Sequence, residues 1–209
     1  MDTTAETANL DTEPERKARA AFRKRGGVLR MADALRAGIH RRTLHSMRDA
    51  GEVESLARGL YRLVDIAPLA NPDLVTVAAR VPHGVVYLVS ALAYHDLTTQ
   101  IPHEVWLAVP RNSEPPRLAY PPVRVVRLSP APYEAGIEAH QLDGVSVKVY
   151  SREKTIADCF KHRNEIGLDT VLEAVRRYKG QGRVDADALL RYAAVCRVAR
   201  VARPYLALL

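Results

Sequence analysis

The chain contains 209 residues, of which 47% are hydrophobic, and it carries a formal net charge of +7. This length allows one domain or two small ones, and the apolar content excludes a chain that is disordered throughout. Two cysteines, Cys159 and Cys196, cannot form a disulfide framework or a four-ligand zinc site, and the apolar runs are too short to span a membrane. We therefore expect a folded cytoplasmic protein with reduced, buried thiols and no membrane partner.

The positive charge is concentrated near the N-terminus. Residues 14–64 hold 13 Lys and Arg against 5 Asp and Glu, whereas residues 1–13 hold four acids and no base. A basic excess on one short segment favours a polyanionic partner such as nucleic acid. We expect a disordered acidic leader over residues 1–13, a basic domain over 14–65 and a second domain over 66–209.

The basic domain has the sequence pattern of a winged helix-turn-helix. The elements expected in chain order are a helix over 14–22 ended by Gly26-Gly27, a helix that closes at Ala37, a turn at Gly38, a helix over 41–49 and two strands within 53–64. Such a motif places its second helix in the major groove of double-stranded DNA.

The helix over 41–49 is the expected DNA-reading element. Leu44 and Met47 are three residues apart and should face the core, which leaves the opposite side of the helix for base contacts. Arginine pairs bidentately with guanine, while imidazole and hydroxyl groups are adaptable hydrogen-bonding partners. The candidate groove contacts are Arg41, Arg42, His45 and Ser46. Asp49 would repel phosphate, so we expect it either to orient an arginine or to accept a hydrogen bond from a cytosine amino group.

The hairpin would form the wing. Gly59 supplies the positive φ that a tight hairpin needs and places Arg58 at the tip, with Arg62 on the returning strand. Arg58 and Arg62 are expected to contact phosphate or the minor groove, which positions a protein without reading sequence. The basic face of the first helix is either solvated or in contact with phosphate; its residues are Arg16, Lys17, Arg19, Arg23, Lys24 and Arg25.

Residues 66–209 predict a mixed α/β domain with a helical tail, which makes the whole chain α+β. The expected elements are a helix that starts at Asn71-Pro72, a helix over 91–97 capped by Ser90, strands over 104–109 and 123–128, a hairpin over 137–150, and helices over 152–162, 168–178 and 186–203.

Three stretches carry a family resemblance: GLYRL at 59–63, SALAYHDLTTQIP at 90–102 and VYSREKTIADCFKHRNEIGLDTVLEAVRRY at 149–178. In this combination the chain resembles the AbiEi antitoxins of type IV toxin–antitoxin and phage abortive-infection systems, over nearly everything after the acidic leader. The resemblance implies an N-terminal winged helix that binds inverted repeats in the operator and represses the operon. It also implies a C-terminal domain that counteracts a nucleotidyltransferase-like toxin without requiring a stable complex.

A dense polar group lies within the last of these stretches. It forms either a salt-bridged structural network or the surface that acts against the toxin. The candidates for such a surface are Lys154, Asp158, Lys161, Arg163 and Asn164.

Enzymatic activity finds little support in the sequence. A restriction-type nuclease needs an Asp and a Glu-x-Lys that converge on a metal, a pattern that Asp96, Glu104 and Lys148 do not form. Cys159 and His162 share a short helical stretch, but Cys159 lies on its expected buried side. We therefore expect no catalytic residue, metal or cofactor. The alternatives are a winged-helix regulator whose C-terminal domain binds a ligand or partner and, third, a nuclease.

Overall fold

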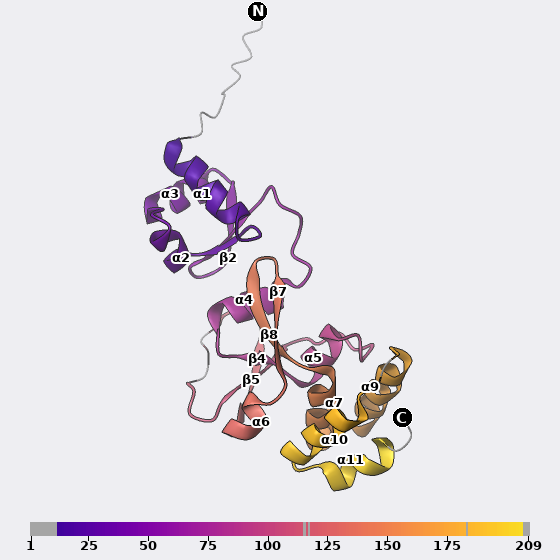
Figure 1. The fold of residues 1–209 in the computed structure, drawn as a ribbon. Coiled ribbons are helices and arrows are strands. Elements are labelled where there is room, and N and C mark those ends of the chain that lie inside the picture. The colour runs from indigo at the N-terminus through magenta and orange to yellow at the C-terminus, as the bar shows by residue number, and fades with distance from the viewer. Residues whose placement is uncertain (1–11, 115, 117, 183, 207–209) are drawn as a thin grey trace, which may run out of the picture. The chain divides into compact units, whose positions relative to one another are not determined.

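The computed structural model describes residues 12–114, 116, 118–182 and 184–206. The predicted leader lies outside the described residues except for Thr12 and Glu13, which begin the first helix. The described residues form helices and sheets of the predicted α+β class and divide into two compact units (Figure 1). The first unit comprises the residues up to Ala70 together with Asp143–Val145, and the second comprises Asn71–Leu142 and the residues from Ser146 onward.

The first unit combines helices with a small antiparallel sheet of order β1-β3-β2. Its described elements are α1 (Glu13–Arg23), β1 (Val28–Arg30), α2 (Met31–Arg36), α3 (Arg41–Asp49), β2 (Val53–Ala57) and β3 (Leu60–Leu63). These bounds agree with the predicted helices and strands, and β1 is an addition that the sequence pattern did not indicate.

Local chemistry explains where α1 begins and how α2 passes into α3. The Thr12 backbone N–H and hydroxyl both donate to the Glu15 carboxylate, at 3.0 and 2.8 Å, as in a capping box. These bonds lower the pKa of Glu15. Between α2 and α3, Gly38 adopts φ +72°, a left-handed conformation that a side chain would strain, and this turns the chain toward α3.

The core of the first unit is built from the inward faces of its helices and sheet. Its members are Ala18, Phe22, Leu29, Ala34, Ile39, Leu44, Met47, Val53, Tyr61 and Leu63. Because Ile39, Leu44, Met47 and Val53 are all buried together, the predicted inward side of α3 is confirmed.

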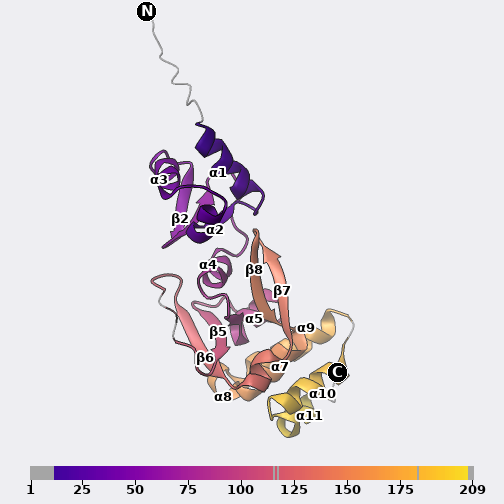
Figure 2. The ribbon, with the colours of Figure 1, turned by 60° about the vertical axis from the view of Figure 1, so that its left-hand side comes forward.

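The second unit contains a five-stranded mixed sheet of order β6-β5-β4-β8-β7. Strand β5 is parallel to β6 and antiparallel to β4, while β4 is parallel to β8. In Figure 2, β5 lies beside β6 and β7 beside β8. The described elements are α4 (Pro72–Arg80), β4 (Val85–Val86), α5 (Leu88–Tyr94), β5 (Val105–Pro110), β6 (Val123–Leu128), α6 (Pro130–Glu134), β7 (Ile137–Leu142), β8 (Val145–Tyr150), α7 (Arg152–Lys161), α8 (Arg163–Ile166), α9 (Leu168–Gly180), α10 (Ala186–Val195) and α11 (Ala199–Leu206).

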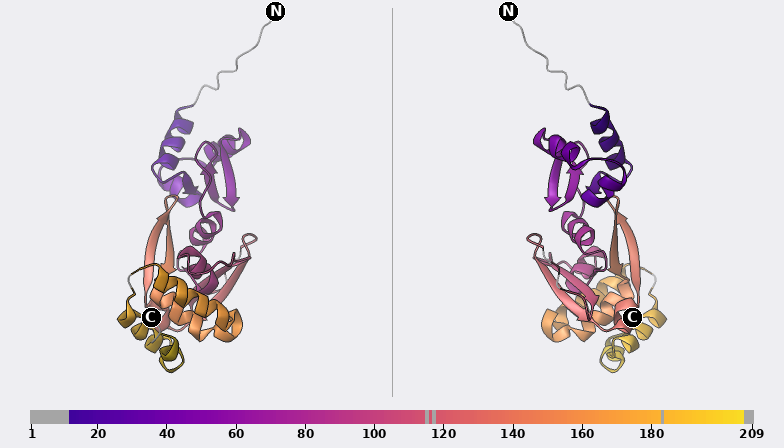
Figure 3. Two further views of the ribbon diagram at one scale, coloured as in Figure 1. Left: turned by 90° about the vertical axis from the view of Figure 1, so that its right-hand side faces the viewer. Right: turned by 90° about the vertical axis from the view of Figure 1, so that its left-hand side faces the viewer.

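Helix α7 is the centre of the helical part of this unit. It begins after Ser151, whose side chain caps the helix by accepting a hydrogen bond from Lys154 N. Helices α5, α9, α10 and α11 all pack against α7, and the orange and yellow C-terminal helices gather together in each view (Figure 3). Seven consecutive residues of α7, from Lys154 to Phe160, are consequently buried.

Two expectations for this unit were wrong. Ser90 does not cap a helix over 91–97, because it lies inside α5, where its buried hydroxyl accepts from Trp106 N at 2.9 Å and donates to Glu104 O at 3.3 Å. The tail is two helices instead of one, and the chain turns between them at Arg197, whose φ is +59°. None of the described helices has the length and apolarity needed to cross a membrane.

Candidate nucleic-acid interface

Helix α3 presents one polar side to solvent. Its apolar side is fixed by Leu44 and Met47, which are 0% exposed. Burial of these two side chains sets the rotation of the helix about its axis, because residues three apart lie on one side. Arg41, Arg42 and His45 therefore lie exposed on the remaining surface, at the beginning and middle of the helix.

Ser46 and Asp49 are also exposed, but each has an internal partner. The Ser46 hydroxyl lies 3.4 Å from Glu15 Oε1 of α1, so it faces a carboxylate. Asp49 accepts bonds from Arg48 Nε at 3.0 Å and Nη2 at 2.8 Å, which fits the first of its two expected roles, the orientation of an arginine. The cationic part of the α3 surface therefore centres on Arg41 and Arg42, away from the acid beside Ser46.

The hairpin of β2 and β3 separates the two predicted wing arginines. Gly59 has φ +74°, as the tight turn requires, and Arg58 beside it is exposed. Arg62 is only 8% exposed. One predicted wing residue therefore lies at the surface and the other inside the unit.

Arg62 has a structural role in place of the expected DNA contact. Its Nη1 donates to Glu54 Oε1 at 2.6 Å, and its Nη2 donates to the carbonyl of Ala67 at 2.8 Å and to that of Ile66. The guanidinium thus joins β2 to the segment that follows β3. Since these bonds and its burial hold it in place, we remove Arg62 from the candidate DNA contacts.

Four of the six bases in and just after α1 are paired with acids of the same unit. The pairs are Arg16 with Glu13, Arg19 with Glu52 at 2.8 Å, Arg23 with Asp65 at 3.0 Å and Arg25 with Asp33 at 3.5 Å. Exposed ion pairs such as that of Arg23 with Asp65 are worth little, so the pairing leaves both interpretations of this face open.

Lys17 and Lys24 are not among these pairs, and Lys17 has a position that sequence spacing did not single out. Its Nζ lies 3.0 Å from the position that a Cβ atom would occupy on Gly38, which places the ammonium beside the turn between α2 and α3. Only the packing of α1 against α3 brings it there, so a one-dimensional pattern cannot find it.

The polar group predicted on α7 is divided between core and surface. Lys154 and Asp158 are 0% and 2% exposed and form an ion pair with each other. Asp158 also accepts from Cys196 Sγ at 3.1 Å, and burial raises the pKa of this carboxyl against the opposing effect of Lys154. Lys154 and Asp158 are therefore part of the core and cannot belong to the expected antitoxin surface.

The remaining candidates of that group lie beyond the buried run. Lys161 and Asn164 are exposed, whereas Arg163 is half-buried and donates to Phe160 O at 3.0 Å. Across the described ranges, no three His, Cys, Asp or Glu side chains come together in an arrangement that could hold a metal ion.

Comparison with known proteins gives the class of the N-terminal segment. Residues 16–64 match the family described as "Transcriptional regulator, AbiEi antitoxin". The predicted resemblance to AbiEi antitoxins is thus confirmed over the segment that contains α2, α3 and the hairpin. No curated protein matches the chain in sequence.

The fold of the chain has a relative among solved structures. The crystal structure of the RV2827C protein from Mycobacterium tuberculosis is similar with a TM-score of 0.52 and 14% sequence identity, covering 94% of this chain and 81% of that one. At this identity the likeness concerns the fold alone.

Proposed function

We propose that the protein is an antitoxin and repressor of a type IV toxin–antitoxin system. In this proposal, a winged helix-turn-helix over residues 14–65 binds double-stranded operator DNA, and the domain over 66–209 counteracts a nucleotidyltransferase-like toxin. The observation that carries the proposal is the exposed Arg41, Arg42 and His45 side of α3, in the segment that matches the AbiEi regulator family.

Operator recognition follows from the chemistry of that side. Arg41 and Arg42 occupy the first turn of α3, the end of such a helix that reaches base edges, and each can donate two bonds to one guanine. His45, one turn along, adds a hydrogen-bonding group. Arg58 at the hairpin tip and Lys17 beside the α2–α3 turn would contact phosphates, which positions the domain without reading sequence. Inverted repeats would allow two chains to bind adjacent half-sites.

Salt dependence separates this mode of binding from apolar association. Each phosphate that a Lys or Arg neutralises releases counterions, so the affinity should fall steeply as salt rises. The slope of log affinity against log salt should become shallower by about one unit for each phosphate contact removed, for example in Arg58→Ala.

Neutralisation of the toxin rests on the resemblance of residues 90–102 and 149–178 to the AbiEi family. On α7 and α8, Lys161 and Asn164 are the exposed members of the predicted antitoxin surface, and these two are the residues we propose for it. The protein would act in the cytoplasm, where the operator and the toxin are both present.

The two activities can be separated with one variant of the full chain. Arg41→Ala/Arg42→Ala should release a reporter placed behind the chain's own upstream DNA, while co-expression of this variant still relieves the toxicity of the proposed nucleotidyltransferase-like toxin. Full repression by the variant would contradict the DNA-binding assignment. Failure of the wild-type chain to relieve toxicity would contradict the antitoxin assignment and leave a regulator.

A regulator with a ligand-binding C-terminal domain is the second candidate. One observation favours it: the second unit contains a pocket of about 740 Å³, which lies within the size range of small-molecule sites.

A further inference from the structure

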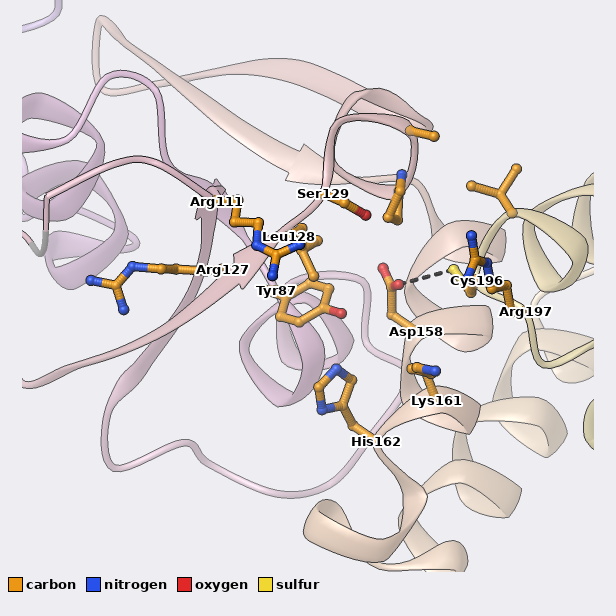
Figure 4. Close-up of a pocket in the computed structure, with 13 residues that line it drawn as sticks. Tyr87, Arg111, Arg127, Leu128, Ser129, Asp158, Lys161, His162, Cys196 and Arg197 are labelled. Atoms are coloured by element: carbon orange, nitrogen blue, oxygen red, sulfur yellow. Dashed lines mark hydrogen bonds between the residues drawn. The ribbon is translucent and has the colours of Figure 1, made fainter.

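The pocket lies wholly within the second unit, where β6, α6, α7 and the turn after α10 meet (Figure 4). Tyr87 and Asp158 lie at its base, and both are buried. The apolar part of the pocket wall is formed by Leu128, Pro132 and Val195. The lining thus combines a partly apolar interior with polar groups, as sites for organic ligands do.

The charges around the pocket are mostly positive. Four cationic side chains line it, Arg111, Arg127, Lys161 and Arg197, against one carboxylate, that of Asp158. The carboxylate does not cancel this excess, because its own ion pair with Lys154 compensates its charge. The net field in the pocket therefore favours an anion.

The four cations differ in orientation. In Figure 4, Arg111 reaches toward Tyr87 and Leu128, and Arg197 lies beside Cys196 on the opposite wall. Arg127 points away from the other labelled side chains, and its Nε lies 3.4 Å from Ser113 O. Arg111 and Arg197 therefore hold the charged groups that face one another across the pocket.

The base of the pocket is preorganised. The Tyr87 ring meets the His162 ring edge to face at 5.7 Å and the Tyr150 ring at the same distance, which fixes its position. Burial and the nearby Asp158 raise the pKa of Tyr87, so its hydroxyl stays protonated and can donate to a ligand. A ligand would thus meet a rigid neutral donor below and guanidinium groups at the rim.

We propose that this pocket binds a small molecule of nucleotide size that carries two or more phosphate groups. Arginine is suited to this role because its planar guanidinium donates two parallel bonds to one phosphate. Lys161 supplies a third cation, and the pocket has room for the organic part against Leu128, Pro132 and Val195. The proposal is independent of DNA binding, since none of these groups belongs to residues 14–65, but it shares Lys161 with the surface proposed to act against the toxin.

The test is a calorimetric titration of the full chain with ATP and with inorganic triphosphate, at low ionic strength because salt screens exposed charges. The wild-type chain should bind ATP at least as tightly as triphosphate. Arg111→Gln/Arg197→Gln should weaken ATP binding at least about tenfold, since it removes charge-assisted bonds. Lys161→Met, made alone in the wild-type chain, should also weaken ATP binding. Thermal unfolding of each variant checks that the exposed substitutions leave the fold intact.

A matched variant tests whether ATP binds instead to the exposed arginines of α3. Arg41→Gln/Arg42→Gln removes the same charge from α3, and it should leave ATP affinity unchanged. The proposal is overturned if neither probe binds the wild-type chain. It is equally overturned if the α3 variant loses ATP binding while the pocket variant keeps it, or if triphosphate binds tenfold more tightly than ATP.

Discussion

The sequence predicts contact residues on both α3 and α7. In the structure these residues are exposed on α3, whereas two of them are buried on α7. On α3, Arg41, Arg42 and His45 are exposed. On α7, Lys154 and Asp158 are buried among helices that pack from several sides. A helix with one packed side leaves its polar residues in water, whereas a surrounded helix has no free side. The same density of charged residues therefore means a surface in one place and an internal ion pair in the other.

The energetic consequences differ as well. An exposed arginine can be replaced at little cost to stability, because water solvates it in the folded and unfolded states alike. A buried charge is stable only with its partner, since desolvation of an unpaired ion costs several kcal/mol. Substitutions should therefore affect binding on α3 and stability on α7.

The largest expected effect is at the buried pair. Lys154→Met leaves the Asp158 carboxylate without its counter-ion and should destabilise the protein by about 3–5 kcal/mol. Lys154→Met/Asp158→Leu removes both charges and should recover most of that loss. Denaturant unfolding of the full chain measures both values. If the double variant were as unstable as the single one, packing and not charge would explain the loss.

The wing arginines offer a smaller contrast within one hairpin. Arg62→Met leaves Glu54 and two carbonyls without their donor and should cost about 1–3 kcal/mol of stability. Arg58→Met, four residues earlier at the exposed tip, should change stability by less than about 0.5 kcal/mol and instead weaken DNA binding. Unfolding and DNA titration of the two variants give the comparison, which an equal loss of stability in both would contradict.

The smallest expected effect is a pH dependence within the second unit. Burial lowers the pKa of His95 from its usual 6.5, and its Nε2 donates to Tyr150 O at 2.7 Å. Because the unfolded chain binds the proton more readily, stability should fall as pH drops from above 6.5 toward the folded pKa. His95→Gln should flatten this decline relative to the exposed His103→Gln. Identical pH profiles for the two variants would remove His95 as the cause.

Sequence periodicity predicted the first unit well because its elements are locally determined. Leu44 and Met47 fix the inward side of α3, and Gly38 and Gly59 mark its turns. The burial of Arg62 could not be predicted, because it depends on carbonyls at Ile66 and Ala67 that only the folded chain brings together.

The second unit was predicted in outline only. Most strands were placed, but the pairing of β4 with both β5 and β8 joins segments that are far apart in sequence. Serine is a preferred residue at helix N-caps, which is why the sequence predicts a cap at Ser90. In the structure its hydroxyl instead accepts a hydrogen bond from a backbone N–H of β5. Tyr87, Arg111, Arg197 and the α7 residues Asp158 and Lys161 are far apart in sequence and line one pocket only in the folded chain, so no sequence motif marks it.

The most direct test of the central claim, that the exposed side of α3 reads DNA, is an anisotropy titration. The probe is a duplex taken from immediately upstream of the chain's own gene, with single base-pair variants of it. Arg42→Ala should lose about 1–3 kcal/mol of binding free energy and relax preference at one base pair. Arg176→Ala, an exposed arginine of α9, should bind as the wild type does. Unchanged affinity and unchanged base preference in Arg42→Ala would contradict the assignment of α3 as the reading helix.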